Sequence, residues 1–210
     1  KSGRIELMAP AGDFTSLQAA LDNGADSIYF GVEQLNMRAR ASMNFTILDL
    51  PEISRRCKEK GVRTYLTLNT IIYDHDLSII KTLLDKAKEA DLTAVIAMDQ
   101  AVIAYARQIG MEVHISTQIN ITNIETVKFY ALFADTMVMS RELSITQIKK
   151  ICSQIEKEQI KGPSGNLVEI EIFGHGALCM AVSGKCYLSL HSHNSSANRG
   201  ACKQNCRKKY

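Results

Sequence analysis

Short apolar runs alternate with longer segments of helical periodicity along the chain. We predict seven strands where β-branched and aliphatic residues cluster, at residues 5–9, 27–31, 63–68, 94–98, 112–116, 136–140 and 168–173. Most of these runs are nearly continuous in apolar character, which is typical of parallel strands covered on both faces. The segments between them predict helices at residues 14–23, 50–60, 77–90, 101–109, 124–133 and 145–159.

Residues that begin and end helices stand at the boundaries of these segments. Side-chain oxygens that can cap a first turn are found at Asp13, Asp76 and Ser144. Glycines that favour a left-handed terminating conformation are found at Gly24, Gly61 and Gly110. Strand and helix alternate six times, which predicts βαβ units and a parallel sheet.

The fold class that this pattern favours is α/β, with a TIM-like (β/α)8 barrel. An open dinucleotide-binding sheet is the alternative, but the turn after the first strand reads PAGD at residues 10–13 and lacks a G-x-G-x-x-G sequence. Seven strands are countable. The eighth must come from the segment after Phe173 or from residues beyond Tyr210, and otherwise the barrel is incomplete.

We expect the barrel to occupy residues 1–178 and a cysteine-rich, basic segment to occupy residues 179–210 at the barrel mouth, with a further C-terminal domain outside this chain. Composition is that of a globular protein, with 46% hydrophobic and 22% charged residues, and no apolar run approaches the ~18 residues of a membrane helix. Residues 185–210 carry six basic side chains and no acidic one, whereas residues 1–184 carry 19 basic and 22 acidic ones. The basic end suggests a polyanion contact, and a solvated tail is the alternative.

Polar residues gather where the predicted strands end, which is the functional face of such a barrel. They include Glu33, Asn69, Asp99, Gln100, Gln118, Asn120, Arg141 and His175, and Gly31 lies at the end of the second strand. A structural role is the alternative for Asp99 as a helix cap and for Asn69 as a turn residue.

Two of the predicted strands supply candidates for ligand binding. The Arg141 guanidinium suits a carboxylate or phosphate, unless it pairs with Glu142. Gln118 and Asn120 can orient a polar ligand, while His114 either faces inward as a functional group or is a satisfied core histidine. The implied ligand is small, polar and anionic.

Four of the six cysteines lie in the last 32 residues, at Cys179, Cys186, Cys202 and Cys206. No secretory segment is recognisable and Cys57 and Cys152 fall at helical positions, so we expect a reducing compartment and thiols that act as ligands or nucleophiles. Four thiolates can hold zinc or a [4Fe–4S] cluster, and the spacing leaves both open, as well as no metal. His175 and Cys179 also outline a cysteine peptidase, although no third orienting group is identifiable.

The stretch EIFGHGALCMAVSGKCYLS at residues 171–189 resembles the signature of peptidase family U32, the collagenase-like proteases. That signature is an acid and an aromatic residue, then Gly-Ala-Leu-Cys, then Gly-x-Cys-x-Leu-Ser. The resemblance extends through LMAPAG (7–12), GADSIY (24–29), SREL (140–143), NRGAC (198–202) and CR (206–207).

Family members that this chain resembles are understood as oxygen-independent hydroxylases, despite the protease name. The branches make 5-hydroxyuridine in tRNA, make 5-hydroxycytidine in 23S rRNA, or hydroxylate ubiquinone precursors. The resemblance implies a [4Fe–4S] cluster on the four cysteines and prephenate as the hydroxyl source for RNA. Short motifs look most like the ribosomal RNA branch, namely LTLNT (66–70) with DHDL (74–77), STQ (116–118) and SANRG (196–200).

We therefore expect a cytoplasmic enzyme that hydroxylates a pyrimidine in rRNA or tRNA with a small anionic co-substrate. His175, His114, Gln118 and Arg141 are the candidate catalytic residues. Substrate binding is expected at Asn69, Asn120, Arg141, Arg199, Lys203 and Arg207. The alternatives are a peptidase that acts through Cys179 or a metal-bound water, and a zinc-stabilised RNA-binding module.

Overall fold

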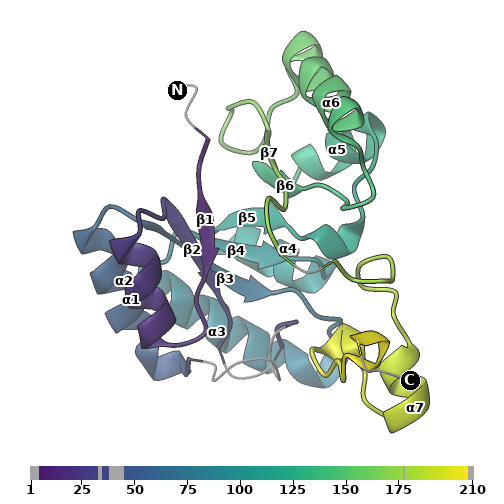
Figure 1. The fold of residues 1–210 in the computed structure, drawn as a ribbon. Coiled ribbons are helices and arrows are strands. Elements are labelled where there is room, and N and C mark those ends of the chain that lie inside the picture. Colours follow the sequence, from purple (N-terminus) through teal and green to yellow (C-terminus); the bar gives the residue numbers. More distant parts are fainter. Residues whose placement is uncertain (1–4, 33–34, 38–44, 177, 208–210) are drawn as a thin grey trace.

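The computed structural model describes residues 5–32, 35–37, 45–176 and 178–207. Glu33, Ala177, Lys208 and Lys209 lie outside the described residues. Seven parallel strands form one sheet in the order β1-β2-β3-β4-β5-β6-β7. They are β1 (Met8–Pro10), β2 (Ser27–Phe30), β3 (Arg63–Leu68), β4 (Ala94–Ala97), β5 (Glu112–Ile115), β6 (Thr136–Val138) and β7 (Glu169–Glu171) (Figure 1). This confirms the predicted α/β, TIM-like architecture.

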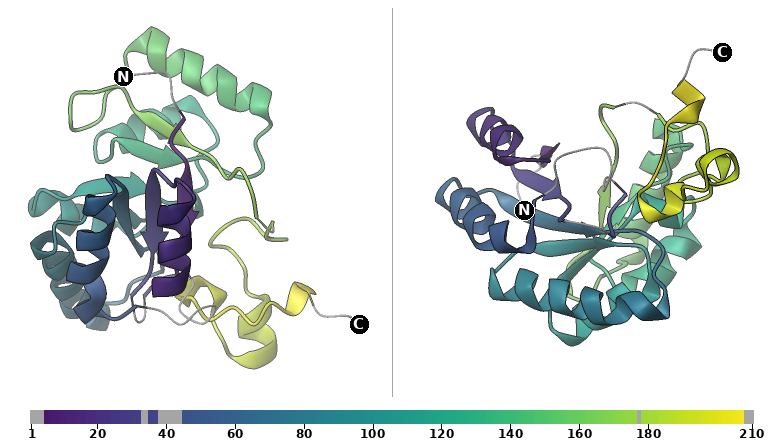
Figure 2. Two further views of the ribbon diagram at one scale, coloured as in Figure 1. Left: turned by 60° about the vertical axis from the view of Figure 1, so that its left-hand side comes forward. Right: turned by 90° about the horizontal axis from the view of Figure 1, so that it is seen from below.

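The sheet curves as a barrel wall that stays open on one side (Figure 2). Each strand pairs in parallel with the next one along the chain, from Met8↔Ser27 to Val138↔Glu171. Among the described residues β1 and β7 are the two edges, and no eighth strand joins them. The predicted strands match in number and order, but β1 begins at Met8 and β7 ends at Glu171, so both edge strands are shorter than the apolar runs indicate.

Helices follow the strands and cover the outer face of the sheet. They are α1 (Phe14–Asp22), α2 (Leu50–Glu59), α3 (Leu77–Glu89), α4 (Gln100–Gln108), α5 (Ile124–Ala131) and α6 (Ile145–Glu158). A seventh helix, α7 (Leu188–His193), lies in the cysteine-rich segment, where none was predicted. No helix in the described ranges is long and apolar enough to cross a membrane.

Two of the three predicted N-caps are confirmed. Asp13 and Ser144 each form a capping box at the start of α1 and α6. Asp76 is different: it precedes α3 but makes no side-chain cap bond to that helix. Its carboxylate instead accepts a local hydrogen bond from the Tyr73 amide at 2.9 Å, at the start of the 3-10 helix η2 (Asp74–Asp76), and a tertiary hydrogen bond from Arg199.

The two faces of the sheet differ in chemistry. The outer face and the helices share the main apolar core, which includes Leu66, Leu84 and Val102. Among the described residues, the buried apolar cluster on the inner face is small and consists of Tyr65, Ala94 and Ile96, with Met8 and Tyr29 packed against it. Because side chains alternate along a strand, polar residues of the same strands point into the barrel interior.

Candidate functional site at the carboxyl ends of the strands

Side-chain amides from two strand ends meet at the barrel mouth. Asn69 follows β3, and Gln118 lies in η3 (Thr117–Ile119) directly after β5. Asn69 Nδ2 lies 3.4 Å from Ser116 Oγ and 3.5 Å from Gln118 Oε1. Ser116 Oγ in turn donates to Gln118 Oε1. The carboxyl ends of parallel strands share one edge of a sheet, so residues far apart in sequence form this amide cluster, defined as Asn69, Ser116 and Gln118.

The amide cluster is fixed in orientation. Asn69 Oδ1 accepts a hydrogen bond from the Met37 amide at 3.1 Å, so Asn69 joins two loops and its bond is not the local one of an Asx turn. Ser116 and Gln118 are buried. Asp99 does act as a cap, since it accepts from the Ala101 amide at 2.9 Å, and it also holds the neighbouring loop through the Ile72 amide at 3.2 Å.

Residues between the first two cysteines of the C-terminal segment cover this cluster. Asn120 Nδ2 donates to the carbonyl of Ser183 at 2.8 Å, and Arg141 Nη2 donates to Ser183 Oγ at 2.5 Å. A Cβ at Gly184 would lie 3.1 Å from Gln118 Cβ, and Gly184 has a φ of +70°. Only glycine fits this close approach without strain.

Arg141 lies near the Glu142 carboxylate, whose pKa the hydrogen bond from Ser140 and the Arg141 charge both lower, but the structure shows no ion pair between these two side chains. Ser140 donates to Glu142, so the expected alternative of an Arg141–Glu142 pair is not what the structure shows. The guanidinium lines a pocket of about 220 Å³ and lies 5.8 Å from the ring of Phe173. A planar cation at an apolar wall can bind a carboxylate in a bidentate manner.

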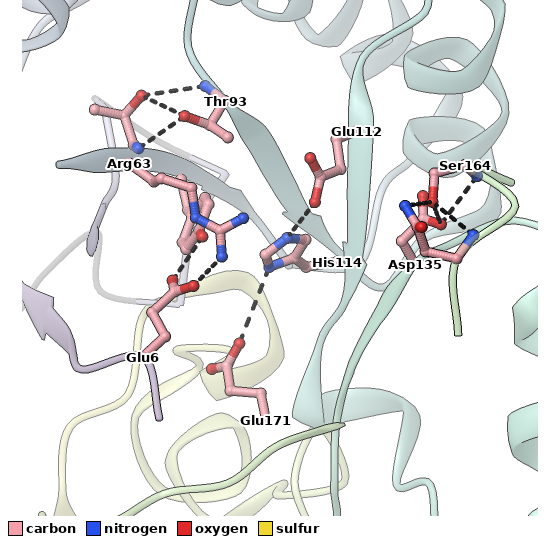
Figure 3. Close-up of polar contacts among 11 residues, drawn as sticks. Glu6, Arg63, Thr93, Glu112, His114, Asp135, Ser164 and Glu171 are labelled. Carbon is pink, nitrogen blue, oxygen red and sulfur yellow. Dashed lines mark hydrogen bonds and ion pairs between the residues drawn. The ribbon is translucent and has the colours of Figure 1, made fainter. Parts of the chain in front are cut away.

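His114 lies in the barrel interior between Glu112 and Glu171 (Figure 3). Its side chain is 2% exposed and packs on Tyr65, with the ring centroids 4.5 Å apart. His114 Nε2 lies 3.1 Å from Glu112 Oε1, and His114 Nδ1 lies 4.0 Å from Glu171 Oε2. Burial raises the pKa of Glu171, and burial also raises the pKa of the Tyr65 hydroxyl.

The four C-terminal cysteines are free thiols. Cys186 is half-buried and the other three, Cys179, Cys202 and Cys206, are exposed. One hydrogen bond joins the neighbourhoods of two of these cysteines, and a second one is local to Cys202. Arg207 Nη2 donates to the Leu178 carbonyl at 3.4 Å, which joins the chain neighbours of Cys206 and Cys179. The Gln204 amide lies 3.4 Å from Cys202 Sγ.

The arrangement of these thiols is not that of a formed metal site. Within the described ranges, no three His, Cys, Asp or Glu side chains are close enough together to hold a metal ion. Four thiols are nevertheless a donor set that suits a [4Fe–4S] cluster or zinc chemically. Cys57 differs from these thiols: burial raises its pKa to about 11, as expected of a structural cysteine.

The remaining predicted site residues are dispersed. His175 and Lys203 are exposed, and the structure does not bring them to the amide cluster. Arg199 is engaged with protein groups, because it donates to the Ile71 carbonyl at 2.6 Å and to Asp76 Oδ2 at 2.5 Å. Arg199 therefore anchors the C-terminal segment on the loop after β3.

Three residues of this region were not predicted as site residues from the sequence. Ser183 binds Arg141 and Asn120 but stands in a loop with no periodic signal. Asp76 looks like an ordinary helix cap. Unlike Ser183 and Asp76, Glu171 did have a signal in the sequence. A carboxylate inside a strand-like apolar run can be interpreted as an inward-facing acid.

Comparison with known proteins identifies relatives of different named activities. The chain is 56% identical over 206 residues to the collagenase of Porphyromonas gingivalis (strain ATCC BAA-308 / W83). This alignment covers 98% of this chain and 50% of that protein. It is 34% identical over 210 residues to the 23S rRNA 5-hydroxycytidine C2501 synthase of Escherichia coli (strain K12), covering 100% of this chain and 30% of that protein. It is 33% identical over 208 residues to tRNA hydroxylation protein P1 of Bacillus subtilis (strain 168), covering 98% of this chain and 46% of that protein. The chain thus spans half or less of the length of these relatives.

The fold has a counterpart among solved structures. The structure of the U32 peptidase Mk0906 matches with a TM-score of 0.56 and 12% sequence identity, covering 85% of this chain and 96% of that chain. At this identity the likeness concerns the fold alone. The sequence model of peptidase family U32 matches residues 12–210, nearly the whole chain. Together with relatives at 56% and 34% identity over almost its full length, this match shows that the chain belongs to peptidase family U32.

Proposed function

We propose that the protein containing this chain hydroxylates a pyrimidine base in RNA, either a cytidine of rRNA or a uridine of tRNA. The observation that carries the proposal is that the amide cluster (Asn69, Ser116 and Gln118) and the Arg141 guanidinium, which is hydrogen-bonded to Ser183, lie at the carboxyl-end edge of the same sheet. The names of two relatives, a 23S rRNA 5-hydroxycytidine synthase and a tRNA hydroxylation protein, support this reaction class. An RNA substrate implies a cytoplasmic location.

The amide cluster suits recognition of a base edge. A carboxamide offers both a donor and an acceptor, as does the Watson–Crick edge of a pyrimidine. In RNA such an edge is accessible in loops and other unpaired segments. The base must leave its stack to enter the barrel mouth, which costs a few kcal/mol in a helix and less in a loop. Gln118 and Asn69 would position the base.

Arg141 suits the anionic co-substrate. Its guanidinium lines the pocket beside Phe173, so a dicarboxylate with an apolar ring could place a carboxylate on Arg141 and its ring on the apolar wall. Prephenate has this chemistry, and we propose it as the hydroxyl source. Exchange of a base hydrogen for a hydroxide removes two electrons from the base and releases a proton, and we propose that a redox partner protein accepts the electrons and water accepts the proton.

Cys179, Cys186, Cys202 and Cys206 would hold a [4Fe–4S] cluster in this proposal. When bound, such a cluster supplies one-electron transfer chemistry. The chain's own contribution is the four thiols and the basic residues around them, which offset thiolate charge. Zinc is the alternative metal.

Mass spectrometry of RNA tests the proposed reaction. We expect tRNA or rRNA from a strain that lacks the gene to have one pyrimidine lighter by a single oxygen atom, and a plasmid copy to restore the modification. A Gln118→Ala copy should fail to restore it, whereas a copy with Gln108→Ala, on the outer helix α4, should succeed. Unchanged RNA in the deletion strain would refute the proposal.

Peptide hydrolysis is a second candidate, favoured by the 56% identity to a protein named collagenase. It would use the exposed Cys179 thiol as the nucleophile. Anaerobically purified protein that cleaves denatured collagen, and loses this cleavage on Cys179→Ser but not on Cys206→Ser, would support it. A metal site that needs all four cysteines predicts equal effects of both substitutions.

A further inference from the structure

The loop after β3 presents two exposed aromatic rings at the functional edge of the barrel. Tyr73 is 52% exposed and the His75 side chain is 74% exposed. Their rings stack with centroids 5.7 Å apart and an interplanar angle of 21°. The contact of such large exposed rings with water is unfavourable, which indicates a surface for a partner.

A buried carboxylate holds this stack in place. Asp76 is 4% exposed and accepts a hydrogen bond from the Tyr73 amide at 2.9 Å. His75 Nε2 lies 3.5 Å from Asp76 Oδ1. A hydrogen bond from Arg199 lowers the pKa of Asp76, which keeps this carboxylate ionised.

Arg199 completes the arrangement from the cysteine-rich segment. Its guanidinium carbon lies 5.0 Å from the Tyr73 ring centroid, within the range of a cation–π contact. The Arg199 side chain is only 25% exposed and is fixed by Asp76 and the Ile71 carbonyl. The aromatic rings are therefore preorganised, which lowers the entropy lost when a ligand stacks on them.

The stack lies close to the amide cluster along the chain. Tyr73 is four positions after Asn69 in the sequence, and four residue steps span at most about 14 Å. Residues 185–210, which include Arg199, carry six basic side chains and no acidic one. This combination of stacked rings and basic residues is typical of surfaces that bind unpaired nucleic acid.

We propose that Tyr73 and His75 form a stacking platform for an unpaired RNA base that neighbours the base held at the barrel mouth. The inference rests on the proposed RNA substrate and adds where the flanking nucleotide binds. When a base is withdrawn into the mouth, its neighbour loses a stacking partner. The platform replaces that partner and so favours the extruded state.

Binding of a fluorescein-labelled, single-stranded RNA oligonucleotide to the full-length protein, measured by fluorescence anisotropy, tests the platform. We expect Tyr73→Ala and His75→Ala each to weaken binding about ten-fold. Tyr73→Phe keeps the ring and should bind like the wild type. Phe129→Ala is the matched control, because Phe129 is also exposed, at 57%, and also packs on aromatic neighbours, but lies on the outer helix α5.

Two results would overturn the inference, and they differ in what else they affect. If the wild type binds RNA and Tyr73→Ala binds equally well, or if Phe129→Ala is equally damaging, the platform is wrong but the RNA substrate stands. If the wild type does not bind any RNA oligonucleotide, the platform falls together with the proposed function. Equal thermal midpoints of the variants would show that a loss of binding is not a loss of fold.

Discussion

His114 Nδ1 lies 4.0 Å from Glu171 Oε2 in the barrel interior, and neither atom has a hydrogen-bond partner among the described residues. His114 Nε2 is engaged with Glu112 Oε1 at 3.1 Å, which favours a proton on Nε2. A protonated Glu171 could therefore donate to Nδ1 if the two groups approached. Burial, which raises the pKa of Glu171, favours that protonated form.

This relationship predicts a pH-dependent effect of Glu171→Gln. The folded-state pKa of Glu171 lies above the unfolded value of 4.5, so the folded protein binds more protons between these two pKa values. The contribution of Glu171 to stability is thus complete below pH 4.5 and is lost as the pH rises through the folded-state pKa. Glutamine does not ionise, so its contribution does not change with pH. The free energy of unfolding of the variant should therefore rise relative to that of the wild type as the pH rises, by on the order of 1 kcal/mol for each unit of pKa shift.

Urea unfolding of both proteins at several pH values measures this difference. Glu169→Gln, two residues earlier on the same strand, is the control. A difference in the free energy of unfolding between wild type and Glu171→Gln that does not change with pH would contradict the prediction.

Arg199→Ala should destabilise the protein and release the C-terminal segment. The substitution leaves Asp76, whose side chain is 6% exposed, without its cation, and we expect a loss of about 2 kcal/mol in the free energy of unfolding. The pKa of Asp76 is lowered mainly by the Arg199 hydrogen bond, so this stability exists above the unfolded pKa of 3.8 and is lost as the pH falls through the folded-state pKa. The difference between the proteins should therefore shrink in acid.

Chemical denaturation and limited proteolysis check this prediction. Arg55→Ala is the control, because Arg55 pairs with Glu52 and Glu59 on an exposed helix face, where an ion pair contributes about 0–1 kcal/mol. Equal losses from both substitutions would mean that the Arg199–Asp76 contact does not anchor the segment.

Gly184→Ala should impair the amide cluster. The new Cβ would lie 3.1 Å from Gln118 Cβ, and the φ of +70° is unfavourable for alanine, so we expect a cost of about 1–3 kcal/mol and loss of RNA modification. Gly110→Ala is the matched control, since Gly110 has a φ of +68° but open space around it. If the two variants complement a deletion strain equally well, close approach of residue 184 to Gln118 is unimportant.

Arg141→Lys should weaken binding of prephenate about ten-fold or more, because lysine keeps the charge but loses the planar, bidentate donor pair. Isothermal titration calorimetry with prephenate measures the effect. Arg107→Lys, on the outer helix α4, should leave the affinity unchanged. An Arg141→Lys protein that binds prephenate as tightly as the wild type would remove Arg141 from the anion site.

Cys202→Ser should abolish iron binding if the four cysteines hold a cluster. In protein purified without air we expect about four iron and four sulfide per chain in the wild type and in Cys152→Ser, and little in Cys202→Ser. Metal and sulfide analysis with an absorption spectrum gives the answer. Stoichiometric zinc without iron in the wild type would return the cysteines to a structural role.

The sequence predicted the number, order and parallel pairing of the strands because these depend on local periodicity. The apolar runs around Leu66 and Val95 are nearly continuous, as strands covered on both faces must be, and the capping residues Asp13 and Ser144 mark helix starts. The family signature at residues 171–189 identified the family for the same reason, since it is a contiguous stretch.

Contacts between residues far apart in the sequence are not marked by any local periodicity or contiguous motif. Asp76 looks like a helix cap in sequence, and only folding shows that its carboxylate binds Arg199, 123 residues later. Likewise, Ser183 meets Arg141 because the segment between Cys179 and Cys186 folds back over the strand ends.

By itself, the sequence determined the α/β architecture, the family and the candidate ligands on each strand end, because each is encoded in short stretches of chain. The tertiary structure decided which candidates meet: Asn69 and Gln118 come together, Arg141 binds Ser183, and His114 faces Glu171 inside the barrel. The physical reason is that hydrogen bonds and burial depend on distance in space, which the packing of the whole sheet sets and no local pattern contains.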